Sequence, residues 1–334
     1  MNDRQKLDDI VGVGSGSPVS GPWRLTVWDS TTTGKLYVFS EEHANKGSCP
    51  QNRHFSSLAS EILQKTSGVH VLVENFIHAY DIRTPKTGIN TSVAQACAAV
   101  NVGILNNLRS CLEVMKINSQ HCPDGCAKRI HFIDPRVDMV SVLPDGKLFE
   151  AISFYAHHKA SQGSFDDAVL TVFESLVHPL SSLLPDRTNL AGRLVGVFGT
   201  FRSKMTPVQR VTFDRIWVRD ITGGIAEINA KYVKLHENYC ASKRKAKTAP
   251  SLAKFSQDME EIKQLYKRYT NKFMDVWLLA HIFMIQNTAA SSGMVMYLGS
   301  LHGLEIEKYL SLHGLRKIHH SENQHLDSCL LMNS

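Results

Sequence analysis

The feature that most constrains the fold is a short apolar run near the end of the chain. Five apolar residues, Met294 to Leu298, are followed by Gly299 and, three residues later, by His302. A run of this length that ends at a glycine is typical of a strand buried on both faces. Residues 304–310 then have the spacing of an amphipathic helix. His302 is therefore predicted on a strand-to-helix turn, where ligands bind in open α/β sheets. The position also suits a histidine that only caps the helix.

Other short strands rich in β-branched and aromatic residues occur along the chain. The predicted strands cover residues 23–28, 35–39, 69–73, 129–133, 294–298 and 315–319. Residues 54–66 have apolar side chains at helical spacing between two of these strands. Short strands that are connected by helices favour a parallel sheet. We therefore predict an α/β fold with a mainly parallel sheet, flanking helices and a large helical insertion.

The composition of the segments divides the chain into five predicted parts. They are a flexible leader over 1–21, the first part of the α/β domain over 22–146, a helical region over 147–287, the last part of the α/β domain over 288–319, and a flexible tail over 320–334. The leader contains a glycine cluster over residues 12–16, but no strand precedes it, as a phosphate-binding loop would require. The helical region includes 207–232 and 252–286, where apolar residues recur at helical spacing.

The overall composition excludes several classes of protein. The chain has 334 residues, 43% hydrophobic and 20% charged, and a net charge of +6. It has no run of about 20 apolar residues, so we predict no membrane span. Its first residues lack the apolar core of a secretory signal, which predicts a cytoplasmic protein that is not secreted. The mild positive charge does not indicate a nucleic-acid partner, and we interpret the basic segment 243–247 as a solvated loop.

The cysteines predict neither disulfides nor a structural zinc site. There are seven, scattered along the chain, which suits free thiols in a reducing compartment. His121, Cys122 and Cys126 lie close together, but a structural zinc ion takes four ligands, usually from two separated pairs. No second pair follows, so we interpret this segment as a loop.

Polar residues follow the predicted strands where each strand ends. If the strands are parallel, these residues lie along one edge of one sheet, where imidazole and carboxylate groups hold a metal ion or remove a proton from water. The alternative is that the loops at a sheet edge are simply polar. The predicted catalytic residues are His43, Glu42, Glu41, Glu74 and His302; the predicted substrate-binding residues are Asp134, Arg136, Asn75 and Ser300; and the predicted ligands of a divalent metal are His43, His302 and Glu74.

These motifs resemble the superfamily of erythromycin-esterase-like, ChaN-like haem-binding, TraB and Tiki proteins. The likeness is carried by Gly299-Ser-Leu-His302, by the strand-end Glu74, and by Ser40-Glu-Glu-His43, in which Ser40 stands where the family has glycine. Asp134-Pro-Arg136 looks like the acidic strand end of many members. The combination is also similar to uncharacterised proteins of large DNA viruses. The resemblance covers about residues 35–140 and 270–318.

The resemblance implies a hydrolase that activates water against an ester or amide bond of a small molecule or peptide. It implies one route with a divalent metal, as in Tiki-like members, and one without, as in the esterases, and the sequence does not separate them. The cofactor is therefore unknown, with a divalent metal as the candidate. The resemblance to viral proteins adds the host cytoplasm as location and a host protein as partner.

Two other interpretations stay open at this stage. One is a catalytically inactive interaction protein of the same fold. Family members often carry an arginine on the helix before the last strand, where this chain has Asp275 and His281, and Arg219 lies far upstream as a substitute. The other is haem or small-ligand binding through His157-His158 or through Met294 and Met296. For these four residues, core or surface roles are the favoured interpretation.

Overall fold

The computed structural model describes residues 3–13, 18–20, 22–30, 34–41, 53–76, 129–134, 198–224, 226–228, 230–231, 234, 252–287, 291–322 and 329–331. The chain divides into two compact units. Unit 1 comprises Met1–Pro135, Lys204–Thr212 and Trp277–Ser334, and unit 2 comprises Arg136–Ser203 and Phe213–Val276.

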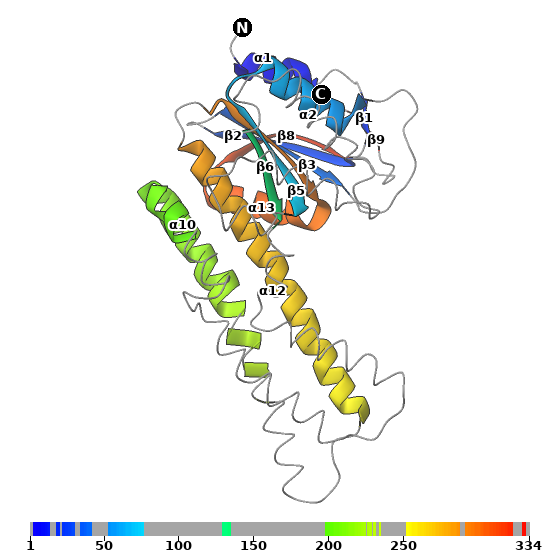
Figure 1. The fold of residues 1–334 in the computed structure, drawn as a ribbon, viewed down its shortest axis with the longest axis vertical. Helices are drawn as coiled ribbons and strands as arrows, with labels where there is room; N and C mark the ends of the chain where they lie inside the picture. The colour runs from blue at the N-terminus through cyan, green and yellow to red at the C-terminus, as the bar shows by residue number, and fades with distance from the viewer. Residues whose placement is uncertain are drawn as a thin grey trace, which may run out of the picture. The chain divides into compact units, whose positions relative to one another are not determined.

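Unit 1 contains a six-stranded sheet with the order β6-β5-β7-β3-β2-β8 (Figure 1). Its strands are β2 (Arg24–Ser30), β3 (Gly34–Glu41), β5 (Val69–Phe76), β6 (Ile130–Asp134), β7 (Gly293–Gly299) and β8 (Arg316–Glu322). The neighbours β6-β5-β7-β3 are parallel, whereas β2 is antiparallel to both β3 and β8. The predicted α/β class is confirmed, with a mixed sheet.

Helices cover both faces of this sheet (Figure 1). Side chains alternate between the faces along each strand. Tyr37 and Phe39 of β3 thus belong to the buried cluster with α1 (Asp3–Val11) and α2 (Phe55–Lys65). On the opposite face, α13 (Ser300–Leu312) and the end of α12 (Leu252–Gln286) contact the strands. All seven residues of β7 are buried, as its uninterrupted apolar run predicts.

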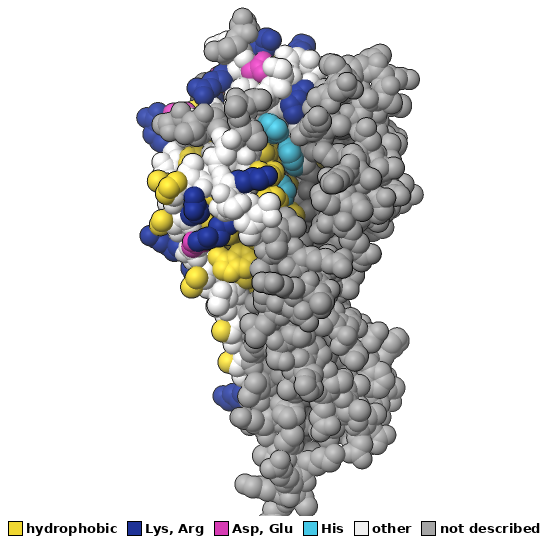
Figure 2. Space-filling view, turned by 60° about the vertical axis from the view of Figure 1, so that its left-hand side comes forward, with side chains coloured by type: hydrophobic (Ala, Val, Ile, Leu, Met, Phe, Trp, Pro, Cys, Tyr) yellow, Lys and Arg dark blue, Asp and Glu magenta, His cyan; other side chains and the backbone are white. Residues whose placement is uncertain are grey.

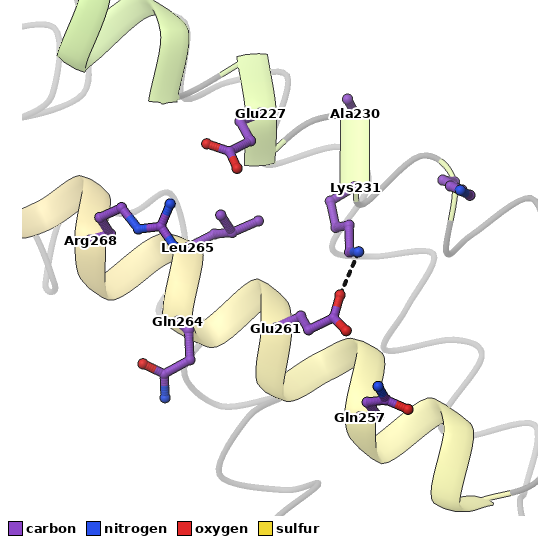
Figure 3. A pocket seen from close by; sticks show the side chains of 9 residues that line it. Glu227, Ala230, Lys231, Gln257, Glu261, Gln264, Leu265 and Arg268 are labelled. Carbon is purple, nitrogen blue, oxygen red and sulfur yellow. Dashed lines mark ion pairs between the residues drawn. The ribbon is translucent and has the colours of Figure 1, made fainter.

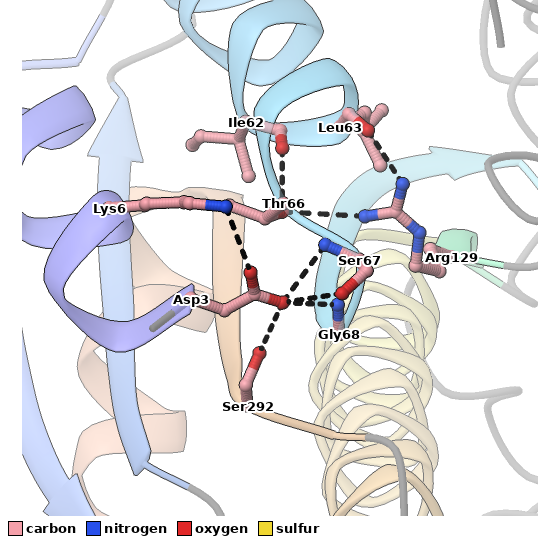
Figure 4. A network of polar contacts seen from close by, with 9 residues as sticks. All are labelled: Asp3, Lys6, Ile62, Leu63, Thr66, Ser67, Gly68, Arg129 and Ser292. Atoms are coloured by element: carbon pink, nitrogen blue, oxygen red, sulfur yellow. Dashed lines mark hydrogen bonds and ion pairs between the residues drawn. The ribbon is translucent and has the colours of Figure 1, made fainter. Parts of the chain in front are cut away.

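The first residues of the chain differ from the predicted flexible leader. Residues 3–11 form α1, whose Leu7, Ile10 and Val11 are buried in the core of unit 1. Asp3 accepts hydrogen bonds from the amides of Ser67 and Gly68, and also from the Ser292 hydroxyl (Figure 4). The prediction of a flexible leader rests on the glycines that follow α1. Leu7, Ile10 and Val11, by contrast, have the spacing of a helix.

A second, small sheet joins both ends of the chain. It has the order β4-β1-β9, from β4 (Arg53–His54), β1 (Pro18–Ser20) and β9 (Cys329–Leu331). Two segments predicted as flexible therefore contain paired strands. Leu330 is fully buried and packs in the same core as α1 and α2. Burial of this apolar side chain stabilises the pairing of β9 with β1.

The described part of the central region is helical. It contains α10 (Pro207–Ile216), a π-helical turn, η3 (Trp217–Thr222), and α12, which has the predicted bounds. In unit 2 the ring of Phe198 packs against Phe213, Trp217 and Phe273. Much of the predicted helical insertion lies outside the described residues, so it stays a prediction. None of the described helices combines the length and apolar character that a membrane span requires.

Candidate functional site

The carboxyl ends of the parallel strands lie along one edge of the sheet in unit 1. Glu41 ends β3, Glu74 lies near the end of β5, Asp134 ends β6, and Gly299 ends β7. Strand β7 pairs with β3 on one side and with β5 on the other. Its end therefore lies between the two glutamates, which come from segments far apart in the sequence.

Glu74 contacts the first turn of α13. Its Oε2 accepts a hydrogen bond from the Gly299 amide, and its Oε1 lies 3.7 Å from Nε2 of His302. The two side chains are only 8% and 6% exposed, respectively. Gly299 is the N-cap of α13, so the carboxylate lies at the positive end of the helix dipole. Strand β7 leads directly into α13, so His302 lies within the first turn of the helix and not on a separate turn before it, and this position brings the imidazole next to Glu74.

Glu41 is bound from the opposite face of the sheet. Tyr297 donates its phenolic hydrogen to Oε2 of Glu41. Burial and the charge of Glu41 raise the pKa of Tyr297 well above its usual value, so the phenol stays a donor at neutral pH. Ser300 donates to the backbone oxygen of Glu41 at 2.7 Å and accepts from the Trp23 indole at 2.9 Å. These contacts connect the ends of β3 and β7.

An ion network ties α13 to the antiparallel strands. Arg24 of β2 donates to Oε2 of Glu307 at 2.9 Å, and Lys317 of β8 lies 2.9 Å from the same oxygen. Arg24 and Glu307 are buried, so the low-dielectric surroundings strengthen their attraction. Nearer the start of the helix, Gly303 packs against Ser40 of β3. The helix that carries His302 is thus held at its first turn and in its middle.

Some predicted site residues lie outside the described residues. This applies to His43, Glu42 and Arg136, and to the side chain of Asn75. Asp134 is buried at the end of β6, where it pairs with Phe76 of β5. The structure thus brings together Glu41, Glu74, Ser300 and His302 at one sheet edge. The convergence of His43 and His302 stays a prediction.

Several residues of the metal and haem interpretations, His43, His157 and His158, lie outside the described residues. Within the ranges that the structure describes, no group of three or more His, Cys, Asp or Glu side chains is arranged to hold a metal ion. Glu74 and His302 supply two of the three predicted ligands. Met294 and Met296 are fully buried in β7, in line with the core role favoured for them. Arg219 pairs with its neighbour Asp220 in unit 2.

A second group of polar residues of unit 1 lies where the end of α12, from Trp277 onwards, packs near β5 and β6. His70 and His131 share a hydrogen bond of 2.9 Å between their rings, and His281 donates from Nδ1 to the Trp277 carbonyl. Burial lowers the pKa of both His70 and His281 to about 4, and Arg129 also lowers that of His70. Figure 2 shows histidine side chains gathered in one place on a face of the molecule.

Unit 2 has a pocket of its own, between α12 and the helical residues around 227–234 (Figure 3). Its volume is about 790 Å³. The lining combines an ion pair, Lys231 with Glu261, and further charged side chains such as Glu227 and Arg268. Exposed charges of both signs are typical of a solvated groove between helices, and none of the predicted site residues lines it.

The sequence interpretation missed Tyr297 and Trp23. Tyr297 is the one residue of the run Met294 to Leu298 that carries a hydroxyl, and a buried tyrosine usually finds a hydrogen-bond partner. This was a usable signal. For Trp23 the sequence contains no such signal, because its contact with Ser300 depends on the antiparallel pairing of β2.

Comparison of the chain with models of known protein families, with curated proteins and with solved structures finds no match.

Proposed function

We propose that this chain is a hydrolase in which His302 and Glu74 activate water for attack on an ester or amide bond. The observation that carries the proposal is the pair itself, an imidazole 3.7 Å from a carboxylate at the carboxyl edge of parallel strands. A neutral histidine removes a proton from water, and a nearby carboxylate stabilises the imidazolium that results. Glu41 and Ser300 are at the same edge and belong to the proposed site.

His43 and Glu42 remain part of the proposal as predicted catalytic residues, with Asp134, Arg136 and Asn75 as predicted substrate-binding residues. A divalent metal on His43, His302 and Glu74 is one form of the mechanism, and direct activation of water by His302 is the other. The substrate is proposed to be a small molecule or a peptide, and the location the cytoplasm. The mainly parallel sheet and the helical insertion complete the proposed architecture.

The test is hydrolysis of a panel of esters and amides by the purified protein, with and without a chelator, together with metal analysis. His302→Gln and Glu74→Gln are expected to abolish any hydrolysis that the protein shows. His320→Gln, which changes an exposed histidine of β8, is the matched control and is expected to retain it. Loss of activity in chelator would select the metal route. Unchanged hydrolysis in His302→Gln and in His43→Ala would contradict the proposal.

A catalytically inactive interaction protein is the second candidate. The contacts of the carboxylates favour it: Glu74 contacts Gly299 and His302, while Glu41 contacts Tyr297. Such contacts also suit carboxylates whose role is to hold the ends of the strands together. If this candidate is correct, Glu74→Gln lowers the stability of a protein that hydrolyses nothing in the panel. A partner would then bind the His302→Gln variant and the unchanged protein with the same affinity.

A further inference from the structure

We propose that Ser40 and Gly303 form a positioning contact that sets the place of His302 relative to Glu74; this rests on the proposed function. Gly303 directly follows His302 on α13 and packs against Ser40. A methyl group on Gly303 would lie 2.1 Å from Oγ of Ser40 and 3.2 Å from its Cβ. The next nearest atom is Cγ1 of Val38 at 3.9 Å, an ordinary contact. Ser40 therefore decides how closely the first turn of α13 approaches the sheet.

Ser40 is suited to this role because its backbone is fixed. It is fully buried in β3 and pairs with Arg24 of β2 on one side and with Leu298 of β7 on the other. Rotation about the Cα–Cβ bond moves Oγ but leaves Cβ in place. Among the described residues its hydroxyl has no hydrogen-bond partner. The side chain therefore acts through its volume, and its removal breaks no hydrogen bond in the described part of the chain.

Helix α13 is attached to the sheet on both sides of the contact between Gly303 and Ser40, so this contact sets the position of the first turn. The Gly299 amide is bound to Glu74 before the contact, and Glu307 is bound to Arg24 one turn after it. His302 lies between these two attachments. Since the helix is tied on both sides, an added methyl on Gly303 lifts or tilts the first turn, which changes the distance from His302 to Glu74.

The test compares Gly303→Ala, Ser40→Gly and the double variant Ser40→Gly/Gly303→Ala in the full chain. The readouts are the NMR chemical shifts of the His302 imidazole at one fixed pH, assigned by the signal missing in His302→Gln, and hydrogen exchange of the Gly299 amide. In Gly303→Ala we expect the imidazole signals to move away from their wild-type positions and exchange to quicken about tenfold. The double variant is expected to restore both, because Ser40→Gly removes Oγ and Cβ together. Gly199→Ala is the control, because an added methyl on this helical glycine meets no atom of another described segment within 4 Å.

Wild-type values of both readouts in Gly303→Ala would overturn the proposal, since Ser40 would then have made room by rotation alone. If Gly303→Ala does not fold, a folded double variant with wild-type readouts supports the proposal. A double variant that fails to fold while Ser40→Gly folds overturns it, because the obstacle is then not Ser40. Neither readout depends on turnover. Absence of hydrolysis with shifted readouts would refute only the proposed function.

Discussion

At the scale of single residues, the site is defined by buried polar groups that satisfy one another. Glu41 and His302 are both buried, and burial of such groups is costly unless each has a partner. Tyr297 supplies a donor to Glu41, and Gly299 supplies one to Glu74. The strength of each contact therefore appears most clearly when one partner is removed and the other stays buried.

Tyr297→Phe is expected to lower the free energy of unfolding by about 1–3 kcal/mol, because the Glu41 carboxylate loses a buried donor. Chemical denaturation at pH 7 measures the change. Lys65→Met is the control. It removes the exposed ion pair between Lys65 and Glu61 on α2, and this should change the free energy of unfolding very little. Equal stability of Tyr297→Phe and the unchanged protein would show that the phenol contributes nothing to the site.

At the scale of elements, two helices are held to the sheet by titratable side chains. Helix α13 is fixed by the network of Arg24, Glu307 and Lys317, and the end of α12 packs where His70, His131 and His281 lie. In the first case the groups are charged and paired. In the second they are neutral at pH 7, because burial lowers their pKa values. The two helices should therefore respond differently to mutation and to pH.

Glu307→Leu is expected to destabilise the protein by about 3–5 kcal/mol, because buried Arg24 loses the nearer and more buried of its two carboxylate partners and keeps, among the described residues, only Glu322 at 3.9 Å. The double variant Arg24→Met/Glu307→Leu should recover most of this loss, since it replaces the buried pair by apolar side chains. Denaturant midpoints of the three proteins provide the measurement. Lys308→Ala, which breaks the more exposed pair with Glu305 on the same helix, serves as control. A double variant no more stable than Glu307→Leu would contradict the expectation.

Acid is expected to weaken the packing of the end of α12, which carries His281, on β5 and β6 of unit 1. Below pH 6.5 an unfolded histidine binds a proton, whereas His70 and His281 stay neutral until about pH 4. The unfolded state therefore binds more protons, and stability falls as pH falls through this window. Between pH 7 and pH 5 each such histidine costs about 2 kcal/mol. Denaturation at both pH values measures the loss, and His281→Leu should reduce it. A pH dependence that His281→Leu leaves unchanged would show that this histidine is not responsible.

At the scale of the whole molecule, unit 1 is assembled from segments that lie far apart in the sequence. Asp3 contacts Ser292, 289 positions later, and β1 pairs with β9 at the other end of the chain. Asp3 also binds two amides before β5. These contacts close the amino-terminal edge of the parallel strands, opposite the candidate site. The first helix is thus a structural part of unit 1.

Asp3→Ala is expected to increase hydrogen exchange in β5 and β7 of unit 1 and to leave η3 of unit 2 unchanged, because the amides of Ser67 and Gly68 lose their acceptor. Exchange followed by mass spectrometry resolves the three segments. Asp9→Ala on α1, whose side chain takes part in an exposed bond with Gln5, is the matched control. Equal exchange in Asp3→Ala and Asp9→Ala would show that the Asp3 contacts do not hold the edge.

The sequence by itself determined the strands of the large sheet, helices α12 and α13, and the junction of β7 and α13 near His302. An apolar run predicts a buried strand, and apolar residues at helical spacing predict an amphipathic helix. These local patterns were sufficient to predict β7, α12 and α13. Only the tertiary structure decided which elements meet. Strand order, and the face that each side chain occupies, determine three features: the antiparallel position of β2 and β8, the contact of Tyr297 with Glu41, and the anchoring of α1. Local propensity fixes neither the strand order nor the face that a side chain occupies, because both follow from how the whole chain buries its apolar surface.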